Sequence, residues 1–465
     1  MWLKTLLLSV LVIASYPLSS SCFRIHAEDR DALDHPVLGT SLRKYKDSHH
    51  LKTNGVPSSR MMMKTHEDQD NRYDSSVRSS LLPSHALLIH ASTSRNVVNV
   101  NDYLNGRDGE VDMNEAFNEA WELACKLEGG VFEVPSGQIY RVKPITFSGP
   151  CTPNLTIRIL GQIRASVDAS DYKDDPREWL VFQNLDSFTV DGGGIINGNG
   201  QKWWKKSCKI DKTQPCKGAP TALTFNDCKN FMVSNLNLKN AQQMHVRIQR
   251  CKNVQVKNLQ VIAPGNSPNT DGIHVTGSQN ILISDSVIRT GDDCISIVSG
   301  SSHVEATNIV CGPGHGISIG SLGKDNGKDY VSDVFVHGAK LSGTTNGLRI
   351  KTWQGGSGYA KNIIFEDIAM NNVTNPIIID QNYCDKEGPC PKQKSAVQVS
   401  NVTYRDIKGT SASKVAMKFD CSKTHPCEGI VLQDIDLRSQ SGEVAKASCL
   451  NVRFQNKGQV SPSCP

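Results

Sequence analysis

A short pattern that recurs eight times constrains the fold of this chain more than any other feature. Each copy opens on a polar pair, alternates apolar with polar residues, and then turns on Asn, Asp or Gly. The copies are KNFMVSNLNL (229–238), KNVQVKNLQV (252–261), QNILISDSVI (279–288), SHVEATNIVC (302–311), SDVFVHGAKL (332–341), KNIIFEDIAM (361–370), SNVTYRDIKG (400–409) and EGIVLQDIDL (428–437). Alternation bounded by turn residues is typical of short strands.

The spacing of the copies predicts how these strands are arranged. Successive copies begin 23 to 39 residues apart, and no helical period separates them. Stacked repeats of this kind predict an all-β fold, a parallel β-helix in which each copy belongs to one coil. Leucine-rich repeats are the alternative, but their L-x-x-L-x-L-x-x-N signature is missing. An elongated repeat also suits 465 residues that are 38% hydrophobic, since a single globular core stops growing at about 250–300 residues.

One segment before the repeats has a helical period instead. Asp112 and Glu115 form a D-x-x-E capping-box pattern. Apolar residues then follow at i, i+3, i+4 and i+7. They are Phe117, Ala120, Trp121 and Ala124. We expect one N-terminal helix that caps the open edge of the solenoid, where unpaired backbone would otherwise invite aggregation.

The first 94 residues divide into two segments that we exclude from the folded domain. In residues 1–22, Lys4 precedes the apolar run LLLSVLVIA, which ends in small residues before Cys22. That run is too short to span a bilayer, so we interpret it as the signal peptide of a secreted, extracellular protein and not as a membrane anchor. Residues 23–94 are rich in Ser, His and charge without a period, and we interpret them as a flexible extension that is removed as a pro-segment. An uncleaved disordered arm is the alternative.

The second strand of each coil also aligns, and its alignment gathers charged residues. DGIHV, DCISI, HGISI and NGLRI share an apolar residue that we expect to point inward. These inward positions are Ile273, Ile295, Ile317 and Leu348. Equivalent positions of a parallel coil lie about 4.8 Å apart, so Asp271, Asp293, His315 and Asn346 form one column. Asp292 precedes this column by one residue.

Arg349 and Lys351 stand two apart on one strand and therefore project outward on the same side. Taken singly, an Asp before Gly is an ordinary turn residue, and such a cationic pair is an ordinary solvated face. Three carboxylates, an imidazole and two cations on successive coils instead favour a site.

The chemistry of this cluster suits hydrolysis of an acidic glycan. Carboxylates on neighbouring coils lie roughly 5–10 Å apart, a range in which one protonates a glycosidic oxygen while another activates water. Crowding raises the pKa of at least one of them, and the two cations would hold an anionic substrate. The formal net charge of +5 suits an acidic partner but is too small and too scattered to indicate nucleic acid. A calcium cage needs six to eight oxygens, whereas an imidazole and two cations crowd this group, so we expect no metal.

The motifs themselves resemble those of a known family. SPNTDGIH (267–274), GDDC (291–294), GHG (314–316) and RIK (349–351) resemble, in this order, the four signature blocks of the polygalacturonases. These are glycoside hydrolases with a right-handed parallel β-helix, and the resemblance extends over residues 95–465.

The closing stretches of the chain narrow the resemblance to plant members. IIIDQNYC (377–384) and CEGIVL (427–432) are similar to the plant endo-acting enzymes of fruit softening, abscission and dehiscence. The resemblance implies endo-acting hydrolysis of α-1,4-D-galacturonosidic bonds in homogalacturonan (pectin), with inversion and no cofactor, in cell-wall loosening and cell separation. An exo-polygalacturonase and a non-catalytic pectin-binding β-helix are the alternatives. It also implies a cell-wall location, a monomer that binds no nucleic acid or membrane, and polygalacturonase-inhibiting proteins as partners.

The resemblance assigns catalytic roles that the residues alone leave open. It makes Asp292 the general acid that protonates the leaving oxygen. Asp271 and Asp293 hold and deprotonate the attacking water, and His315 tunes the cluster by hydrogen bonding. Without the resemblance, acid and base cannot be told apart.

The substrate-binding roles are implied in the same way. Arg349 and Lys351 bind the galacturonate carboxylate at the cleavage point. Tyr383 lines a sugar subsite, and Asn269 sits beside the catalytic water.

The cysteines predict a disulfide framework. Of fifteen, Cys22 leaves with or near the signal, and an even fourteen remain in an oxidising compartment. The resemblance implies the pair Cys294–Cys311. The other expected pairs are the local loops Cys384–Cys390 and Cys421–Cys427, the C-terminal Cys449–Cys464, Cys228–Cys251 from equivalent positions of successive coils, and Cys125–Cys151 and Cys208–Cys216 by elimination. Three N-x-S/T sequons, at Asn154, Asn372 and Asn401, fit a secreted glycoprotein.

Overall fold

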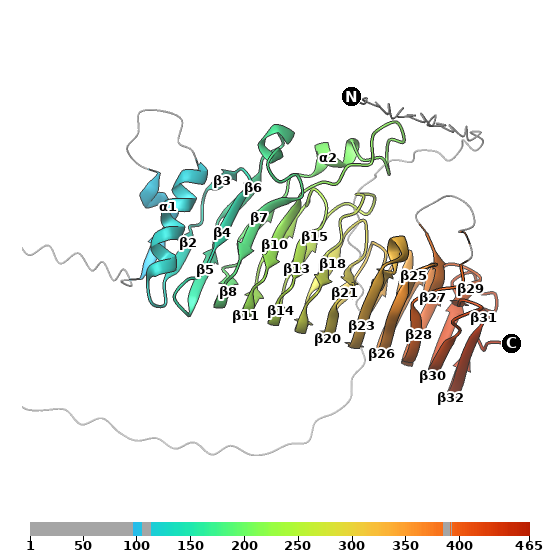
Figure 1. Cartoon of the computed structure of the whole chain (residues 1–465). Helices are drawn as coiled ribbons and strands as arrows, with labels where there is room; N and C mark the ends of the chain where they lie inside the picture. The colour runs from blue at the N-terminus through green and yellow to red at the C-terminus, as the bar shows by residue number, and fades with distance from the viewer. Residues whose placement is uncertain (1–95, 105–112, 385–390, 392) are drawn as a thin grey trace, which may run out of the picture. The chain divides into compact units, whose positions relative to one another are not determined.

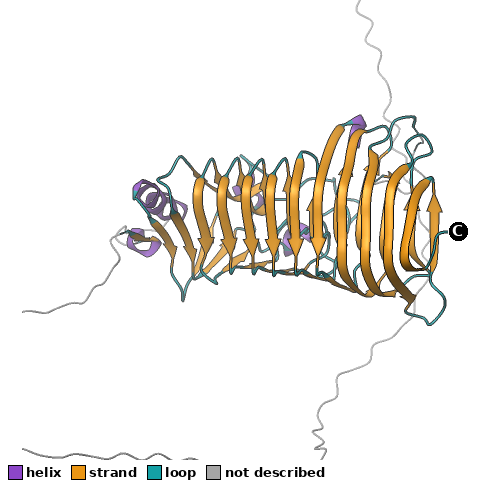
Figure 2. Cartoon of the chain, turned by 90° about the horizontal axis from the view of Figure 1, so that it is seen from below, coloured by secondary structure: helices purple, strands orange, loops and turns teal. Residues whose placement is uncertain are grey.

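The computed structural model describes residues 96–104, 113–384, 391 and 393–465. The predicted signal peptide (1–22), the extension (23–94), the capping residue Asp112 and Cys390 lie outside the described residues. Everything described belongs to one compact unit, Leu87–Pro465. Figure 1 shows that unit as a row of stacked coils, and Figure 2 shows the long parallel strands of one face. In the described part of the chain, no helix has the length and apolar character needed to cross a membrane.

Two parallel sheets run along the solenoid. The smaller sheet contains β4 (Ile145–Ser148), β7 (Glu178–Gln183), β10 (Thr221–Asn226), β13 (Val246–Gln249), β16 (Ile273–Thr276), β19 (Ile295–Ile297), β22 (Ile317–Leu322), β25 (Asn346–Trp353), β27 (Asn375–Tyr383), β29 (Val415–Asp420) and β31 (Lys446–Leu450). The larger sheet contains β1 (Val97–Asn99), β2 (Val131–Val134), β3 (Ile139–Val142), β5 (Leu155–Ile159), β6 (Gln162–Ala165), β8 (Asp186–Asp191), β9 (Ile195–Asn197), β11 (Lys229–Ser234), β12 (Asn237–Lys239), β14 (Lys252–Lys257), β15 (Gln260–Ile262), β17 (Gln279–Ser284), β18 (Val287–Arg289), β20 (Ser301–Thr307), β21 (Val310–Cys311), β23 (Lys328–His337), β24 (Lys340–Ser342), β26 (Ser357–Val373), β28 (Gln398–Ser411), β30 (Cys427–Ser439) and β32 (Val452–Ser461). The helical elements are α1 (Met113–Lys126), α2 (Gln201–Lys205) and the short 3-10 turns Val100–Tyr103, Ala169–Tyr172 and Lys324–Asn326.

The predicted parallel β-helix is confirmed, and each of the eight sequence copies contributes larger-sheet strand residues to one coil. Each middle coil has one strand of the smaller sheet followed by two of the larger, as in β13, β14 and β15. The larger sheet pairs the copies in register, and the same position of every copy is buried. That column is Phe231, Val254, Ile281, Val304, Val334, Ile363, Val402 and Ile430. The smaller sheet stacks Ile273, Ile295, Ile317 and Leu348, as expected. Apolar residues at every second position therefore line one continuous interior.

Asparagine recurs at the second position of several sequence copies, inside strands of the larger sheet. Asn230, Asn253 and Asn280 are the second residues of β11, β14 and β17, and all three adopt positive φ (55°, 57° and 58°). Asn tolerates this left-handed region better than most residues because its short amide hydrogen-bonds locally. Here the amides also bond to one another, from Asn253 to Asn230 at 2.7 Å and from Asn280 to Asn253 at 3.0 Å. These amide hydrogen bonds hold successive coils in register on the outer surface of the solenoid. Stacked apolar side chains hold the same register in its interior.

Helix α1 closes the N-terminal end of the solenoid, as predicted (Figure 1). Its buried face includes the whole predicted stripe, Phe117, Ala120, Trp121 and Ala124. Trp121 packs tilted against Phe147 of β4 at 5.0 Å between ring centroids. The helix thus covers apolar side chains of the first coils that no preceding coil could cover.

Five of the predicted disulfides are confirmed. They are Cys125–Cys151, Cys208–Cys216, Cys294–Cys311, Cys421–Cys427 and Cys449–Cys464. Cys384 is also disulfide-bonded, but its expected partner lies outside the described residues.

The predicted Cys228–Cys251 bridge is wrong. Both cysteines are buried thiols in equivalent positions of successive coils, as anticipated. However, stacked residues have parallel Cα–Cβ vectors, whereas a disulfide needs vectors that converge. Each thiol donates instead to a main-chain carbonyl of the preceding coil, Cys228 Sγ to Phe182 O and Cys251 Sγ to Phe225 O, both at 3.4 Å.

Candidate active site

The predicted site residues meet at one end of the smaller sheet's strands. Asp271 precedes β16, Asp292 and Asp293 precede β19, and His315 precedes β22. Main-chain bonds from Gly272 N to Asp293 O (2.9 Å) and from Cys294 N to Gly316 O (2.8 Å) hold these segments in register. They surround a cavity of about 590 Å³. Its lining includes all eight predicted residues: Asp271, Asp292, Asp293, His315, Arg349, Lys351, Tyr383 and Asn269.

Asp293 is the most deeply buried carboxylate of the site, with a side chain 2% exposed. Arg349 Nη2 lies 2.5 Å from its Oδ1, and Lys351 Nζ lies 3.0 Å from its Oδ2. Ser318 Oγ donates a further hydrogen bond to Oδ1 at 2.8 Å. Both oxygens are thus paired, as a buried charge requires. The two cations that were expected to hold substrate also hold Asp293.

Asp292 is paired with the imidazole of His315. His315 Nδ1 lies 2.8 Å from Asp292 Oδ1, and the two side chains are 38% and 17% exposed. Burial works to raise the pKa of Asp292, but the hydrogen bond and charge of His315, with the charge of Lys351, hold that pKa below its ordinary value. Asp292 is the most exposed of the three carboxyls, since Asp271 is 11% and Asp293 2% exposed.

The pKa of Asp271 is shifted in the direction opposite to that of Asp292. Burial raises its pKa well above the ordinary value, and the neighbouring charges of Asp292 and Asp293 raise it further. Ser296 Oγ donates to Asp271 Oδ2 at 2.8 Å, and His274 Nδ1 lies 2.7 Å from the same hydroxyl. The surroundings of Asp271 and Asp292 therefore shift their pKa values in opposite directions.

Three supporting residues were missed by the sequence reasoning: His274, Ser296 and Ser318. Together with Arg349 they occupy one outward position on four successive strands, where each pairs with the next. Ser296 binds Asp271, and Ser318 links Asp293 to Arg349 Nε at 2.9 Å. The sequence alignment could have predicted these residues. Each directly follows one of the aligned inward residues, an isoleucine or the leucine, and therefore points outward on the same strand.

The remaining predicted positions lie as follows. Tyr383 lines the cavity, and Lys351 Nζ lies 5.6 Å from its ring centroid. Asn269, exposed and with φ of 56°, also lines it. Asn346 belongs to the backbone column but not to the cavity lining, since its side chain is buried and its Oδ1 accepts from Asn375 Nδ2 at 3.1 Å.

Comparisons with known proteins identify the family of the chain. The model of the glycosyl hydrolases family 28 matches residues 127–464. The chain belongs to this family. Polygalacturonase QRT2 of Arabidopsis thaliana is 59% identical over 369 residues, covering 79% of this chain and 84% of the relative. Polygalacturonase-2 of Solanum lycopersicum is 56% identical over 369 residues, covering 79% and 80%.

Solved structures share the fold. The polygalacturonase of Erwinia carotovora ssp. carotovora superposes with a TM-score of 0.62 at 22% identity, covering 76% of this chain and 95% of that one. The endo-xylogalacturonan hydrolase of Aspergillus tubingensis gives 0.66 at 23% identity, covering 78% and 100%.

A metal ion fits poorly into this family 28 site. Ligand atoms of Asp292, Asp293 and His315 lie within 4.8 Å of one another, the kind of group that can hold a cation. Both oxygens of Asp293 already bind cationic groups, and one oxygen of Asp292 binds His315. A calcium ion would need six to eight oxygens at a point already occupied by positive charge.

The raised pKa of Asp271 predicts how the stability of this family 28 protein depends on pH. Such a carboxyl has a higher pKa in the folded than in the unfolded protein. Its contribution to stability is complete below the unfolded pKa, near 3.9. That contribution is lost as the pH rises through the folded pKa. Asparagine does not titrate. We therefore expect Asp271→Asn to melt above the parent protein at pH 7, with the difference shrinking toward pH 4. Calorimetry at both pH values measures this, and a difference independent of pH would contradict it.

Proposed function

We propose that the chain is a secreted endo-polygalacturonase that hydrolyses α-1,4-D-galacturonosidic bonds of homogalacturonan with inversion. The observation that carries the proposal is the arrangement of three carboxyls in different electrostatic states beside two cations, in one cavity of a family 28 chain. Its relatives with 56–59% identity are polygalacturonases. A pair of carboxyls, one protonated and one ionised, is the requirement of inverting glycoside hydrolysis.

Asp292 is the general acid in this proposal. It is the most exposed carboxyl and so the best placed to reach a glycosidic oxygen. In the substrate-free protein its pKa is low, partly because of the charge of Lys351. A galacturonate carboxylate that binds Arg349 and Lys351 brings negative charge close to Asp292. It also neutralises part of the positive charge of Lys351. Both effects raise the pKa of Asp292.

Asp271 is the base, together with Asp293. Once Asp292 takes up a proton, one of the charges that raises the pKa of Asp271 disappears, and Asp271 can ionise. Asp271 and Asp292 titrate as a coupled pair, so in this proposal substrate binding moves a proton from Asp271 to Asp292. Asp271 and Asp293 then hold and deprotonate water, with Asn269 beside it. Tyr383, next to Lys351, forms part of the sugar subsite.

The proposed function includes a location outside the cell. We infer that residues 1–22 direct secretion and that the extension 23–94 is removed, which leaves a monomeric catalytic domain in the cell wall. Five disulfides within the described residues and the exposed sequon asparagines Asn154, Asn372 and Asn401 support this inference. Polygalacturonase-inhibiting proteins are the protein partners that we propose.

The product profile on polygalacturonic acid tests the proposal. With EDTA present, we expect new reducing ends and an early fall in viscosity, without unsaturated products that absorb ultraviolet light. Unsaturated products that EDTA abolishes would indicate a lyase. Galacturonate monomer from the earliest time points, with little fall in viscosity, would indicate an exo-acting enzyme. Absence of turnover in a folded, processed sample would indicate a pectin-binding protein.

A further inference from the structure

A fully buried histidine lies one coil before Asp271. His245 directly precedes β13, and its exposed fraction is 0%. It does not line the active-site cavity, so it cannot touch a substrate there. Because a buried polar ring costs free energy unless it is hydrogen-bonded, the partners of this imidazole indicate what it does.

Other coils place a small residue where this coil has His245. The strand pairs of the smaller sheet align the residues that follow this position, from Leu223 through Val246 to Leu348. The residues equivalent to His245 are Ala222, Gly272, Cys294, Gly316 and Gly347. Stacking of the coils therefore does not require an imidazole, and His245 adds hydrogen-bonding groups that the other coils lack.

The main chain determines which ring nitrogen of His245 carries the hydrogen. Ala241 N lies 3.4 Å from His245 Nε2, and a main-chain N–H can only donate, so Nε2 accepts. In a neutral imidazole the other nitrogen then carries the hydrogen. That nitrogen, Nδ1, lies 3.1 Å from the carbonyl oxygen of Asp271 and donates to it. The ring thus links Ala241 to Asp271 in one orientation.

Burial keeps this imidazole neutral. Burial lowers the pKa of His245 to about 4, although the main-chain carbonyls of Asp271, Ile262 and Thr270 work in the opposite direction. Among these contacts, all within the described part of the chain, Asp271 alone has a titratable side chain. Well above that pH the ring is uncharged, so Nε2 keeps the lone pair that accepts from Ala241.

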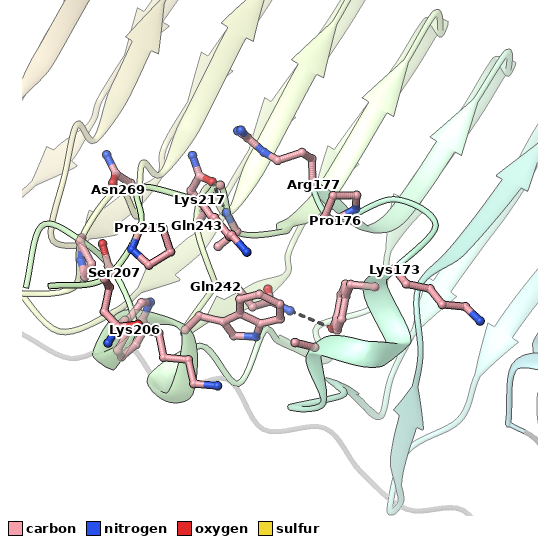
Figure 3. A pocket seen from close by; sticks show the side chains of 18 residues that line it. Lys173, Pro176, Arg177, Lys206, Ser207, Pro215, Lys217, Gln242, Gln243 and Asn269 are labelled. Atoms are coloured by element: carbon pink, nitrogen blue, oxygen red, sulfur yellow. Dashed lines mark hydrogen bonds between the residues drawn. The ribbon is translucent and has the colours of Figure 1, made fainter. Parts of the chain in front are cut away.

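The far end of this link rests on a segment that is itself held in place. Trp204 Nε1, in α2, donates to the carbonyl oxygen of Ala241 at 3.0 Å. The next residue, Gln242, donates from Nε2 to Tyr172 Oη at 3.1 Å (Figure 3). Ala241 is thus anchored independently of the active site, and His245 connects Asp271 to that anchor.

The main chain at Asp271 needs such a connection. Gly272 follows it, and glycine leaves the backbone conformationally free. A Cβ at Gly272 would come within 2.5 Å of the carbonyl oxygen of Cys294, so a stiffer residue does not fit there. The main-chain N–H of His245 donates to the Asp271 carbonyl at 2.8 Å, and Nδ1 adds a second donor to the same oxygen. Two donors restrict the peptide to which the Asp271 side chain is attached.

We propose that His245 is a positioning residue, whose imidazole holds the main chain of Asp271 so that its carboxyl stays directed at the attacking water. The proposal rests on the proposed function, which makes Asp271 part of the base. Reaction rates are sensitive to such positioning, since a displacement of about 1 Å can cost about 10²-fold. Substrate affinity should not depend on His245, because Arg349 and Lys351 bind the galacturonate carboxylate.

Three substitutions of His245 separate positioning from packing. His245→Leu fills a similar volume without a donor. His245→Asn has an amide N–H at the reach of Nδ1, so it can still donate to Asp271. His245→Gln extends to the position of Nε2, where it can accept from Ala241 but no longer donates to Asp271.

We expect His245→Leu and His245→Gln to lower kcat on polygalacturonate about 3- to 10-fold, the effect of one neutral hydrogen bond. Their KM should stay that of the parent, and His245→Asn should keep most of the parent kcat. Calorimetry gives the melting temperature of each variant. The kcat should follow the donor to Asp271, whereas a role in packing alone would make it follow the melting temperature.

His337 provides the matched control. It lies on β23 of the larger sheet, is half-buried and does not line the active-site cavity. His337→Leu and His337→Asn should therefore match the parent in kcat and KM.

Hydrogen exchange of residues 264–272 measures the anchoring without turnover. This segment should exchange faster in His245→Leu than in the parent, because local opening no longer has to break the bond from Nδ1. His245→Asn should exchange nearly as slowly as the parent, and both His337 variants should match it.

Three results would overturn the proposal: an unchanged kcat in His245→Leu, the same kcat in the Asn and Gln variants, or a loss that lies in KM alone. If His245→Leu does not fold, the comparison of Asn with Gln decides. The proposed function fails separately, if the parent does not cleave polygalacturonate. In that case hydrogen exchange still decides whether His245 holds the segment of Asp271.

Discussion

Asp292→Asn is expected to reduce kcat on polygalacturonate by about 10²–10⁴-fold, the usual contribution of a general acid. Asparagine keeps the size of the side chain and its contact distance to His315, but it has no proton to give. The melting temperature should fall only slightly. Because the folded pKa of Asp292 is lowered, its small stabilising contribution is present above the unfolded pKa and is lost as pH falls through the folded pKa.

Asp367→Asn is a matched control for this change. Asp367 is an exposed residue of β26 in the larger sheet with φ of 53°, a conformation that asparagine adopts readily. Steady-state kinetics and calorimetry of both variants separate chemistry from folding. Substantial residual turnover in Asp292→Asn would remove it from the role of acid, and a large drop in its melting temperature would make the Asp292–His315 pair structural.

Lys351→Ala is expected to weaken affinity for charged galacturonan by about 10- to 100-fold, in the range of a lost charge-assisted hydrogen bond. The loss should be smaller on methyl-esterified pectin, which carries fewer carboxylates. The structure adds a second effect, because Lys351 also pairs with Asp293, whose side chain is 2% exposed. Breaking a buried pair on one side costs about 3–5 kcal/mol, so the melting temperature should fall as well.

Lys418→Ala provides the comparison for Lys351. Lys418 also projects outward from the smaller sheet, on β29, but it is 43% exposed and pairs with Asp420 at 3.7 Å. Its removal should leave both the melting temperature and substrate preference almost unchanged. Equal losses of Lys351→Ala on charged and esterified substrates would refute recognition of the galacturonate carboxylate.

Residues near one another in the chain made the solenoid predictable. Alternation of period two shows which side chains point inward, and copies that share a turn residue show where each coil begins. Once Ile273 is aligned with Ile295 and Ile317, parallel stacking places Asp271, Asp293 and His315 on neighbouring coils. The positions of the candidate site could thus be predicted to the residue. The inference failed for Cys228 and Cys251, because stacking sets the distance between side chains but also makes them parallel.

The states of the site residues depend on burial and on charges distant in sequence, and only the tertiary structure determines them. Asp293 meets Lys351, 58 residues away, through Oδ2. Asp271 and Asp292 are chemically identical side chains, yet burial and two carboxylate neighbours raise the pKa of one while His315 lowers that of the other. Periodicity is a local property that the order of residues determines by itself. A pKa is a sum over the surroundings, and those surroundings exist only after the coils have stacked.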